Sequence, residues 1–173
     1  MGFFTRTASI VAVSLAVLIP QFASIAPAAA TDGWAGGCVF TNAPVTYSPA
    51  VAPGPGAGQI SINFTGTCAV GGSVGGGTLF GTLPGGSGAC GSGAYSGPLT
   101  LKGPGQLGAG VTALATVVVG VDVVMMVLTS GITFGAVGTF VQVPTATVGC
   151  VTGTVTTAQW PGTLVFEDPT LDS

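Results

Sequence analysis

The feature that most constrains the fold is a long apolar run at residues 111–128. Fourteen of its 18 residues are Ala, Val, Leu or Met, so the run belongs either in a membrane helix or in buried strands. Ten of the 18 are β-branched, which favours strands, and Gly120 and Asp122 interrupt the run. A carboxylate near the middle of a membrane helix would cost about 2.5 to 3.5 kcal/mol. We therefore expect no membrane partner, but two buried strands, Val111–Val119 and Val123–Leu128, that supply most of the core and meet in a hairpin turn.

Residues 1–30 have the features of an export signal. Arg6 gives a positive start, residues 8–22 are apolar, and three alanines at 28–30 form a small-residue cleavage pattern. The pattern predicts cleavage between Ala30 and Thr31. The mature protein is then expected outside the cytoplasm, either secreted or held in the cell envelope.

Residues 31–173 are the length of one ordinary domain, long enough to bury its own core. This part has one cation, Lys102, against five carboxylates, a net charge of minus four. Binding to nucleic acid requires clustered Lys and Arg, so we expect no nucleic-acid partner.

Four cysteines, an even number, lie in the predicted mature domain and predict two disulfides in an exported protein. The chain has no His and no closely spaced cysteine pair, so we expect no metal site and no cofactor. Three pairings are possible, and we favour Cys38 with Cys68 and Cys90 with Cys150.

The clearest strand signal is the alternation of apolar and polar side chains at Gln59–Thr65. Ile60, Ile62 and Phe64 are expected on one buried face, with polar residues on the other. Besides the two strands of the apolar run, further strands are expected at 78–83, 95–101, 132–143, 145–156 and 163–166. Flexible Gly-rich loops are expected at 71–77 and 85–88, a long Pro/Gly-rich loop at 43–58, and a flexible acidic C-terminus at 167–173.

Eight to ten short strands between Gly/Pro turns predict an all-β domain. Two architectures fit this pattern: an antiparallel β-sandwich, immunoglobulin-like or jelly-roll-like, and a closed barrel. The sequence alone does not choose between them.

Most catalytic sites are excluded by residue type. Without His, neither a Ser–His nor a Cys–His pair can form. The remaining hypothesis is a glycan hydrolase that uses two carboxylates, Asp122 with Glu167 or Asp168, which would have to stand about 5 to 9.5 Å apart. A turn aspartate and a solvated acidic tail are the interpretation we favour, so we expect a protein that is not an enzyme.

Four large amphipathic rings are candidates for binding. Exposed rings of this kind stack on sugars or anchor protein partners, whereas buried ones pack over the ends of a β-domain. Both interpretations stay open for Trp34, Tyr47, Tyr95 and Trp160.

Three short segments resemble small exported, Gly/Thr/Val-rich, two-disulfide β-proteins of actinomycetes, many of which have no assigned function. They are Ala28–Ala30, Gly66–Cys68 and Gly88–Gly93. The resemblance implies an exported, cross-linked β-domain. Together with the missing catalytic groups, it predicts a non-enzymatic structural or interaction module at the cell surface or in the medium. Its expected partner is a cell-wall polymer, a polysaccharide or another exported protein.

Three other functions stay open. The first is a small hydrophobic-ligand carrier, with a cleft lined from residues 111–143, or a carbohydrate-binding protein. The second is an envelope β-pore, in which apolar strand faces meet lipid and Thr/Ser faces line the lumen. The third is the glycan hydrolase that would use Asp122.

Overall fold

Antiparallel strands run through the whole part of the chain that the computed structural model describes, which is residues 35–52, 56–89, 92–120, 122–131, 134–143 and 154–167. The predicted signal peptide at 1–30 lies outside these residues. None of the helices in the described part is long and apolar enough to cross a membrane. The strands are β1 (Gly36–Asn42), β2 (Pro44–Val51), β3 (Gly56–Ala57), β4 (Gln59–Val70), β5 (Ser73–Leu83), β6 (Gly85–Ala89), β7 (Ser92–Lys102), β8 (Val111–Val119), β9 (Val123–Ser130), β10 (Phe134–Val141), β11 (Val155–Gln159) and β12 (Gly162–Glu167), and a short 3-10 helix, η1 (Gly105–Ala109), joins β7 to β8.

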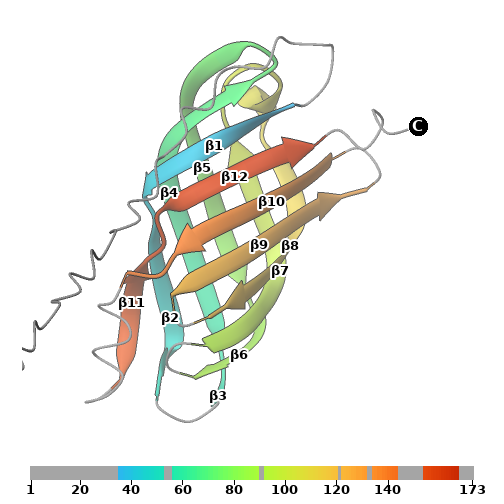
Figure 1. Cartoon of the computed structure of the whole chain (residues 1–173). Helices are drawn as coiled ribbons and strands as arrows, with labels where there is room; N and C mark the ends of the chain where they lie inside the picture. Colours follow the sequence, from blue (N-terminus) through green and yellow to red (C-terminus); the bar gives the residue numbers. More distant parts are fainter. Residues whose placement is uncertain are drawn as a thin grey trace, which may run out of the picture.

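Eight of these strands close into an antiparallel barrel (Figure 1). Around the ring the order is β4, β1, β12, β10, β9, β8, β7 and β5, and β5 pairs with β4 to complete it. Pairing of β1 with β12 joins the first and last strands of the described chain. The closed barrel predicted as one of two architectures is therefore confirmed, and the sandwich is wrong, because the two ends of one sheet pair instead of two sheets stacking.

The other four strands are continuations of barrel strands past short interruptions. Ala43 separates β1 from β2, Gly58 separates β3 from β4, Pro84 separates β5 from β6, and Trp160 with Pro161 separates β11 from β12. The continuations pair with one another and with β4 and β7 at one end of the barrel, the lower end in Figure 1, which we call the extended end. The described chain is thus an up-and-down meander of eight long strands, and short interruptions in four of them give the twelve labelled strands.

A column of aromatic side chains fills the barrel. Phe64 on β4 lies 5.8 Å from Phe40, 5.5 Å from Phe140 and 6.5 Å from Trp160, measured between ring centroids. Aliphatic side chains from most of the barrel strands pack around the rings, including Ile60, Leu79, Leu99, Val117, Met126 and Leu164. An eight-stranded barrel has an interior just wide enough for side chains to fill, and this one is filled along the column.

One disulfide lies inside the barrel wall. Cys38 on β1 and Cys68 on β4 stand directly opposite each other in the strand register, are fully buried and form a disulfide, so this predicted pair is confirmed. Cys90 and Cys150 lie outside the described residues. The bridge joins the strand that closes the barrel to its neighbour in the middle of the ladder.

The long loop predicted at 43–58 is wrong. Residues 44–51 belong to β2, which pairs with β4 and β11, and residues 56–57 form β3, which pairs with β6. Its prolines are compatible with a strand because Pro44 begins β2 and Pro49 follows Ser48, the last residue paired with β4.

The structure also corrects the predictions for the Gly-rich loops and the acidic C-terminus. Of the Gly-rich loop predicted at 71–77, Gly71 and Gly72 form a tight turn with positive φ of 53° and 81°, but residues 73–77 belong to β5. The loop predicted at 85–88 is part of β6. Glu167 belongs to β12, where its backbone is opposite Gly135, and not to a flexible tail. Residues 168–173 and most of the strand predicted at 145–156 lie outside the described residues.

Removing the buried disulfide tests how much the closure depends on it. A Cys38→Ala/Cys68→Ala double variant is expected to lose about 3 to 4 kcal/mol of unfolding free energy, because the bridge closes a loop of 30 residues in the unfolded chain. Equilibrium unfolding in urea, with the oxidised wild type as the reference, measures the difference. A loss below about 1 kcal/mol would contradict the expected contribution.

Candidate functional site

The predicted binding aromatics come together, but inside the protein. Tyr47, Tyr95 and Trp160 are buried at the extended end of the barrel, and the Tyr47 ring centroid lies 6.4 Å from each of the other two. They continue the aromatic column outward from Phe64. Of the two interpretations, packing over the end of the domain is the one observed for these three rings, and Trp34 lies outside the described residues.

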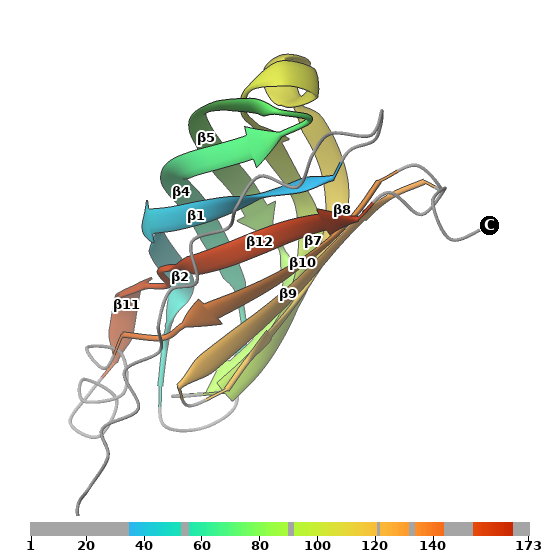
Figure 2. The same cartoon turned by 45° about the horizontal axis from the view of Figure 1, so that its top comes forward.

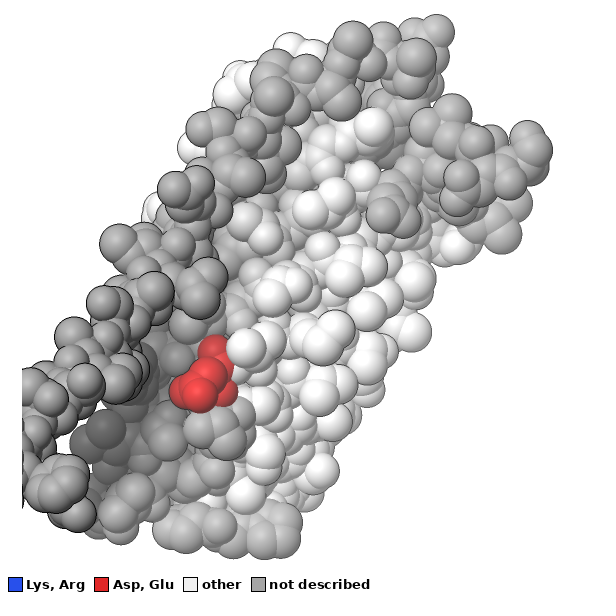
Figure 3. Space-filling model, in the orientation of Figure 1, with Lys and Arg blue, Asp and Glu red and all other residues white. Residues whose placement is uncertain are grey.

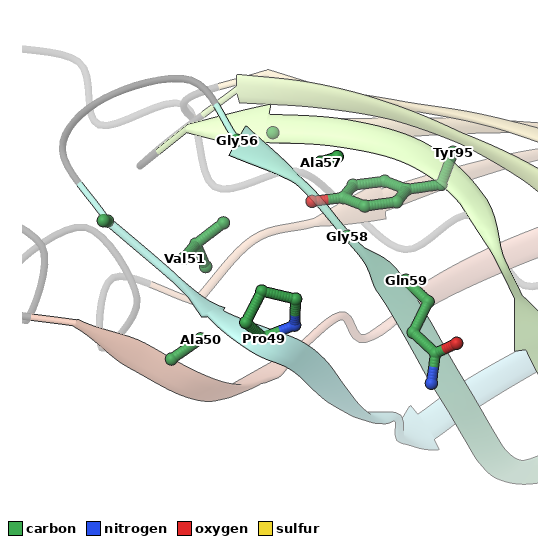
Figure 4. Close-up of a pocket in the computed structure, with 10 residues that line it drawn as sticks. Pro49, Ala50, Val51, Gly56, Ala57, Gly58, Gln59 and Tyr95 are labelled. Atoms are coloured by element: carbon green, nitrogen blue, oxygen red, sulfur yellow. The ribbon is translucent and has the colours of Figure 1, made fainter.

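A small cavity opens beside the Tyr95 ring (Figure 4). Its volume is about 140 Å³, and its walls come from the end of β2, from β3, from the start of β4 and from Tyr95. In the close-up, the Tyr95 ring reaches from β7 toward Gly56, Ala57 and Gly58, with Pro49 and Val51 on the opposite wall. The neutral Tyr95 hydroxyl at the edge of this cavity can donate or accept one hydrogen bond.

Glycines make room for the Tyr95 ring. A Cβ added at Gly86, Gly88 or Gly93 would collide with this ring or its hydroxyl. The Gly-rich sequence of β6 and the start of β7 is therefore explained by close packing of a strand against a ring. Burial raises the pKa of the Tyr47 hydroxyl, and Tyr95 beside it adds to the rise. Burial also raises the pKa of Tyr95.

The proposed carboxylate pair is not brought together. Asp122 is exposed just before β9, at the extended end, as the turn interpretation predicted. Glu167 lies at the far end of β12, where its backbone is opposite Gly135, and Gly135 is opposite Thr129 of β9. The strand rise places the backbones of Asp122 and Glu167 about 20 Å apart along the sheet, too far for a shared catalytic pocket. Asp168 lies outside the described residues.

The apolar run at 111–128 is not buried on both faces, and this prediction is wrong. Every second residue of β8 and β9 points into the barrel, and the alternate residues point outward. Among them Leu114 is 60% exposed and Met125 54% exposed. The prediction failed because a closed barrel has only one interior face, so a continuous apolar run must present half of its side chains outside.

Exposed apolar side chains continue from these strands onto β10 and β12 and form one surface, which we call the outer apolar face. Its central row runs across four strands, because Val127 is opposite Thr116 of β8 and Val137 of β10, and Val137 is opposite Val165 of β12. In the neighbouring rows, Val118 is opposite Met125, and Val123 is opposite Val141. The members of the face are Leu114, Val118, Val123, Met125, Val127, Val137, Val141 and Val165.

Charge is nearly absent from this surface. Figure 3 shows the described surface over β9, β10 and β12 without basic atoms, and with acidic atoms where β9 begins. Asp122 is exposed at that end. The residues between the apolar ones are threonines and a glycine, Thr116, Thr129, Thr139, Thr163 and Gly135.

The opposite side of the barrel, which includes β4 and β5, is mainly polar. Figure 2 shows these two strands above β12, β10 and β9. Outward residues of β4 include Ser61, Asn63 and Thr67, all exposed. Hydroxyl pairs connect neighbouring strands here, with Ser61 3.1 Å from Thr82. The Lys102 ammonium lies 5.8 Å from the centroid of the Phe80 ring on this side. Val74 and Phe80 of β5 are also exposed on this side, so the exterior has one continuous apolar face and one mainly polar side.

Comparison with known proteins does not indicate which molecule contacts the outer apolar face or the cavity beside Tyr95. No protein-family model matches the chain, no curated protein is significantly similar to it, and no solved structure matches it. The outer apolar face and the cavity beside Tyr95 are the two features of the described residues from which a function can be argued. The sequence signal for the outer apolar face was the apolar run at 111–128, since a half-buried strand would alternate apolar and polar residues.

The buried tyrosines predict alkaline instability. A raised pKa in the folded state means that the folded protein keeps its phenol protons where the unfolded chain loses them, so stability falls as the pH rises above about 10. A Tyr47→Phe variant is expected to lose less stability than the wild type between pH 8 and 11. Unfolding in urea at each pH measures this, and tyrosinate absorbance reports the ionisation of the chain's two tyrosines directly. Parallel pH profiles for the two proteins would contradict the assignment.

Proposed function

We propose that this protein is a non-enzymatic interaction module whose binding surface is the outer apolar face of β8, β9, β10 and β12. The observation that supports this is the continuity of the exposed apolar side chains across four paired strands. Single exposed apolar residues are ordinary on proteins, but a contiguous patch marks a surface that is covered by another molecule.

The other half of the exterior serves as an internal comparison. It belongs to the same barrel and has the same strand geometry, yet its outward residues are mainly Ser, Thr and Asn. Both halves have the backbone requirements of strands, so strand propensity alone does not account for Val, Leu and Met on one side. Contact with a partner accounts for these apolar residues.

The described interior gives no support to the envelope pore. A pore requires a polar lumen, whereas the inward side chains here are aromatic and aliphatic and fill the barrel. Stacking of sugars on exposed rings likewise has no support from Tyr47, Tyr95 and Trp160, which are buried. A protein partner fits an uncharged apolar surface better than a polysaccharide, which would need many hydrogen-bonding groups.

Export is part of the proposal. The buried Cys38–Cys68 bridge is compatible with an oxidising compartment, and the N-terminal sequence has the pattern of a cleaved signal. An interaction module at the cell surface or in the medium would meet other exported proteins there.

A photo-crosslinking residue placed on each side tests the binding surface. Position 127 is at the centre of the outer apolar face, and position 67 is an exposed threonine on the polar side. In a secreting host we expect an adduct from position 127 and none from position 67, because only the first is covered. The mass of the adduct, from intact-protein spectrometry, assigns the partner class. Equal adducts from both positions, or none, would contradict the proposal.

A second candidate function rests on the cavity beside Tyr95. Its volume of about 140 Å³ is close to that of engineered cavities that bind benzene. A small neutral aromatic or aliphatic ligand with one polar group would fill it and hydrogen-bond to the Tyr95 hydroxyl.

A thermal-shift screen with phenol-sized neutral compounds tests this second candidate. A ligand that raises the melting temperature of the wild type is expected to bind at least about fivefold more weakly to Tyr95→Phe, which keeps the ring and removes the hydroxyl. Tyr47→Phe, whose ring does not line the cavity, is the control. If no compound raises the melting temperature, or if the two variants respond equally, the cavity has no ligand of this class.

A further inference from the structure

We infer that the outer apolar face binds a second copy of this chain, so that two barrels pack with these faces together. This inference rests on the proposed function, which identifies the face as a binding surface, and it adds the identity of the partner. Two packed barrels would turn the outward side chains of β8, β9, β10 and β12 into a core between two sheets.

Charge is the first argument for a second copy. A surface that had evolved for a different charged or polar partner would carry groups complementary to it. The outer apolar face carries Val, Leu, Met and Thr, and the described charged residues beside it are Asp122 and Glu167, at opposite ends of the face. The centre of a contact between two copies therefore carries no described charge, and a surface that is complementary to itself can form a two-fold interface.

Shape is the second argument. The face consists of neighbouring antiparallel strands, and sheets pack face to face about 10 Å apart with interleaved side chains. The three valines and one threonine of the central row are β-branched and stiff, so they lose little side-chain entropy on contact. A two-fold axis through the centre of the face would place Val127 of one copy next to Val127 and Val137 of the other.

Lipid is the alternative occupant, and the described exterior favours it less. A membrane barrel needs an apolar band around its whole circumference, flanked by aromatic girdles. A protein that lies on a membrane surface generally uses basic residues together with large aromatic ones. Here the continuous apolar face covers one side only, and on the opposite side Val74 and Phe80 of β5 are exposed among mainly polar residues, with Lys102 beside Phe80.

Area determines how strong the association should be. Four strands about 4.8 Å apart and about seven residues long give the face a footprint on the order of 450 Å². A stable interface buries about 800 Å² per partner, so the face predicts a weak dimer that forms as concentration rises.

Sedimentation velocity of the purified protein, from low micromolar to millimolar concentration, tests the inference. We expect a monomer–dimer equilibrium in the wild type. Val127→Glu and Val127→Lys should each raise the dissociation constant at least about tenfold, because each buries a charge at the centre of the contact. Thr67→Glu and Thr67→Lys make the same changes at an exposed strand position on the polar side and should leave the constant unchanged.

The decisive measurement is the association of the Val127→Glu variant with the Val127→Lys variant after mixing. Glu on one copy and Lys on the other should restore association to within about threefold of the wild type if the two faces pack on each other. Circular dichroism verifies that each variant is folded, as expected for outward positions. Mixed variants that stay monomeric, or loss of association in the Thr67 variants, would overturn the inference.

A monomeric wild type at every concentration would also overturn it, and two further measurements would then identify the correct occupant. Flotation with uncharged phosphatidylcholine vesicles would indicate lipid. A photo-adduct from position 127 to a different protein would indicate a heterologous partner, and the proposed function would survive although the dimer had failed.

Discussion

Pairing of β1 with β12 is the constraint on which the rest of the structure depends. It joins the beginning and end of the described chain and converts a meander of strands into a ring, so each of the eight barrel strands has a paired neighbour on both sides. The Cys38–Cys68 bridge fastens β1 to β4 on its other side. Phe40, from β1, contributes a ring to the column inside the barrel. Opening this one ladder would expose the column and two strand edges together.

Closure also determines what the outside looks like. Each strand has one face inside, and the interior is filled by aromatic and aliphatic side chains. Any further apolar residues on the same strands must then point outward. In β4 and β7 the outward positions hold mainly Ser, Thr and Asn, but in β8, β9, β10 and β12 they hold mainly Val, Met, Leu and Thr. The proposed binding surface is thus a direct consequence of a strand sequence with two apolar faces in a fold with one interior.

Much of the fold was predictable from the sequence, but the outer apolar face was not. Alternation at Gln59–Thr65 gave the correct buried and exposed sides of β4, and the bounds of β8 match the predicted strand Val111–Val119. Barrel and sandwich share the same local pattern, since only the long-range pairing of β1 with β12 separates them. A continuous apolar run gives no sign of which face lies inside, so burial on both faces was the natural but wrong expectation. The loop predicted at 43–58 failed because prolines at strand ends resemble those of loops.

Two neighbouring methionines allow the most direct test of the central claim, that one face of the apolar run is inside the barrel and the other is outside and available for binding. Met125 is 54% exposed on the outer apolar face, and Met126 is fully buried in the core. Mild peroxide oxidation followed by peptide mass spectrometry measures the accessibility of each sulfur. The structure predicts rapid oxidation of Met125 with protection of Met126 in dilute protein, and slower oxidation of Met125 when its partner is bound. Equal oxidation of the two residues, or protection of both in the dilute protein, would contradict the account.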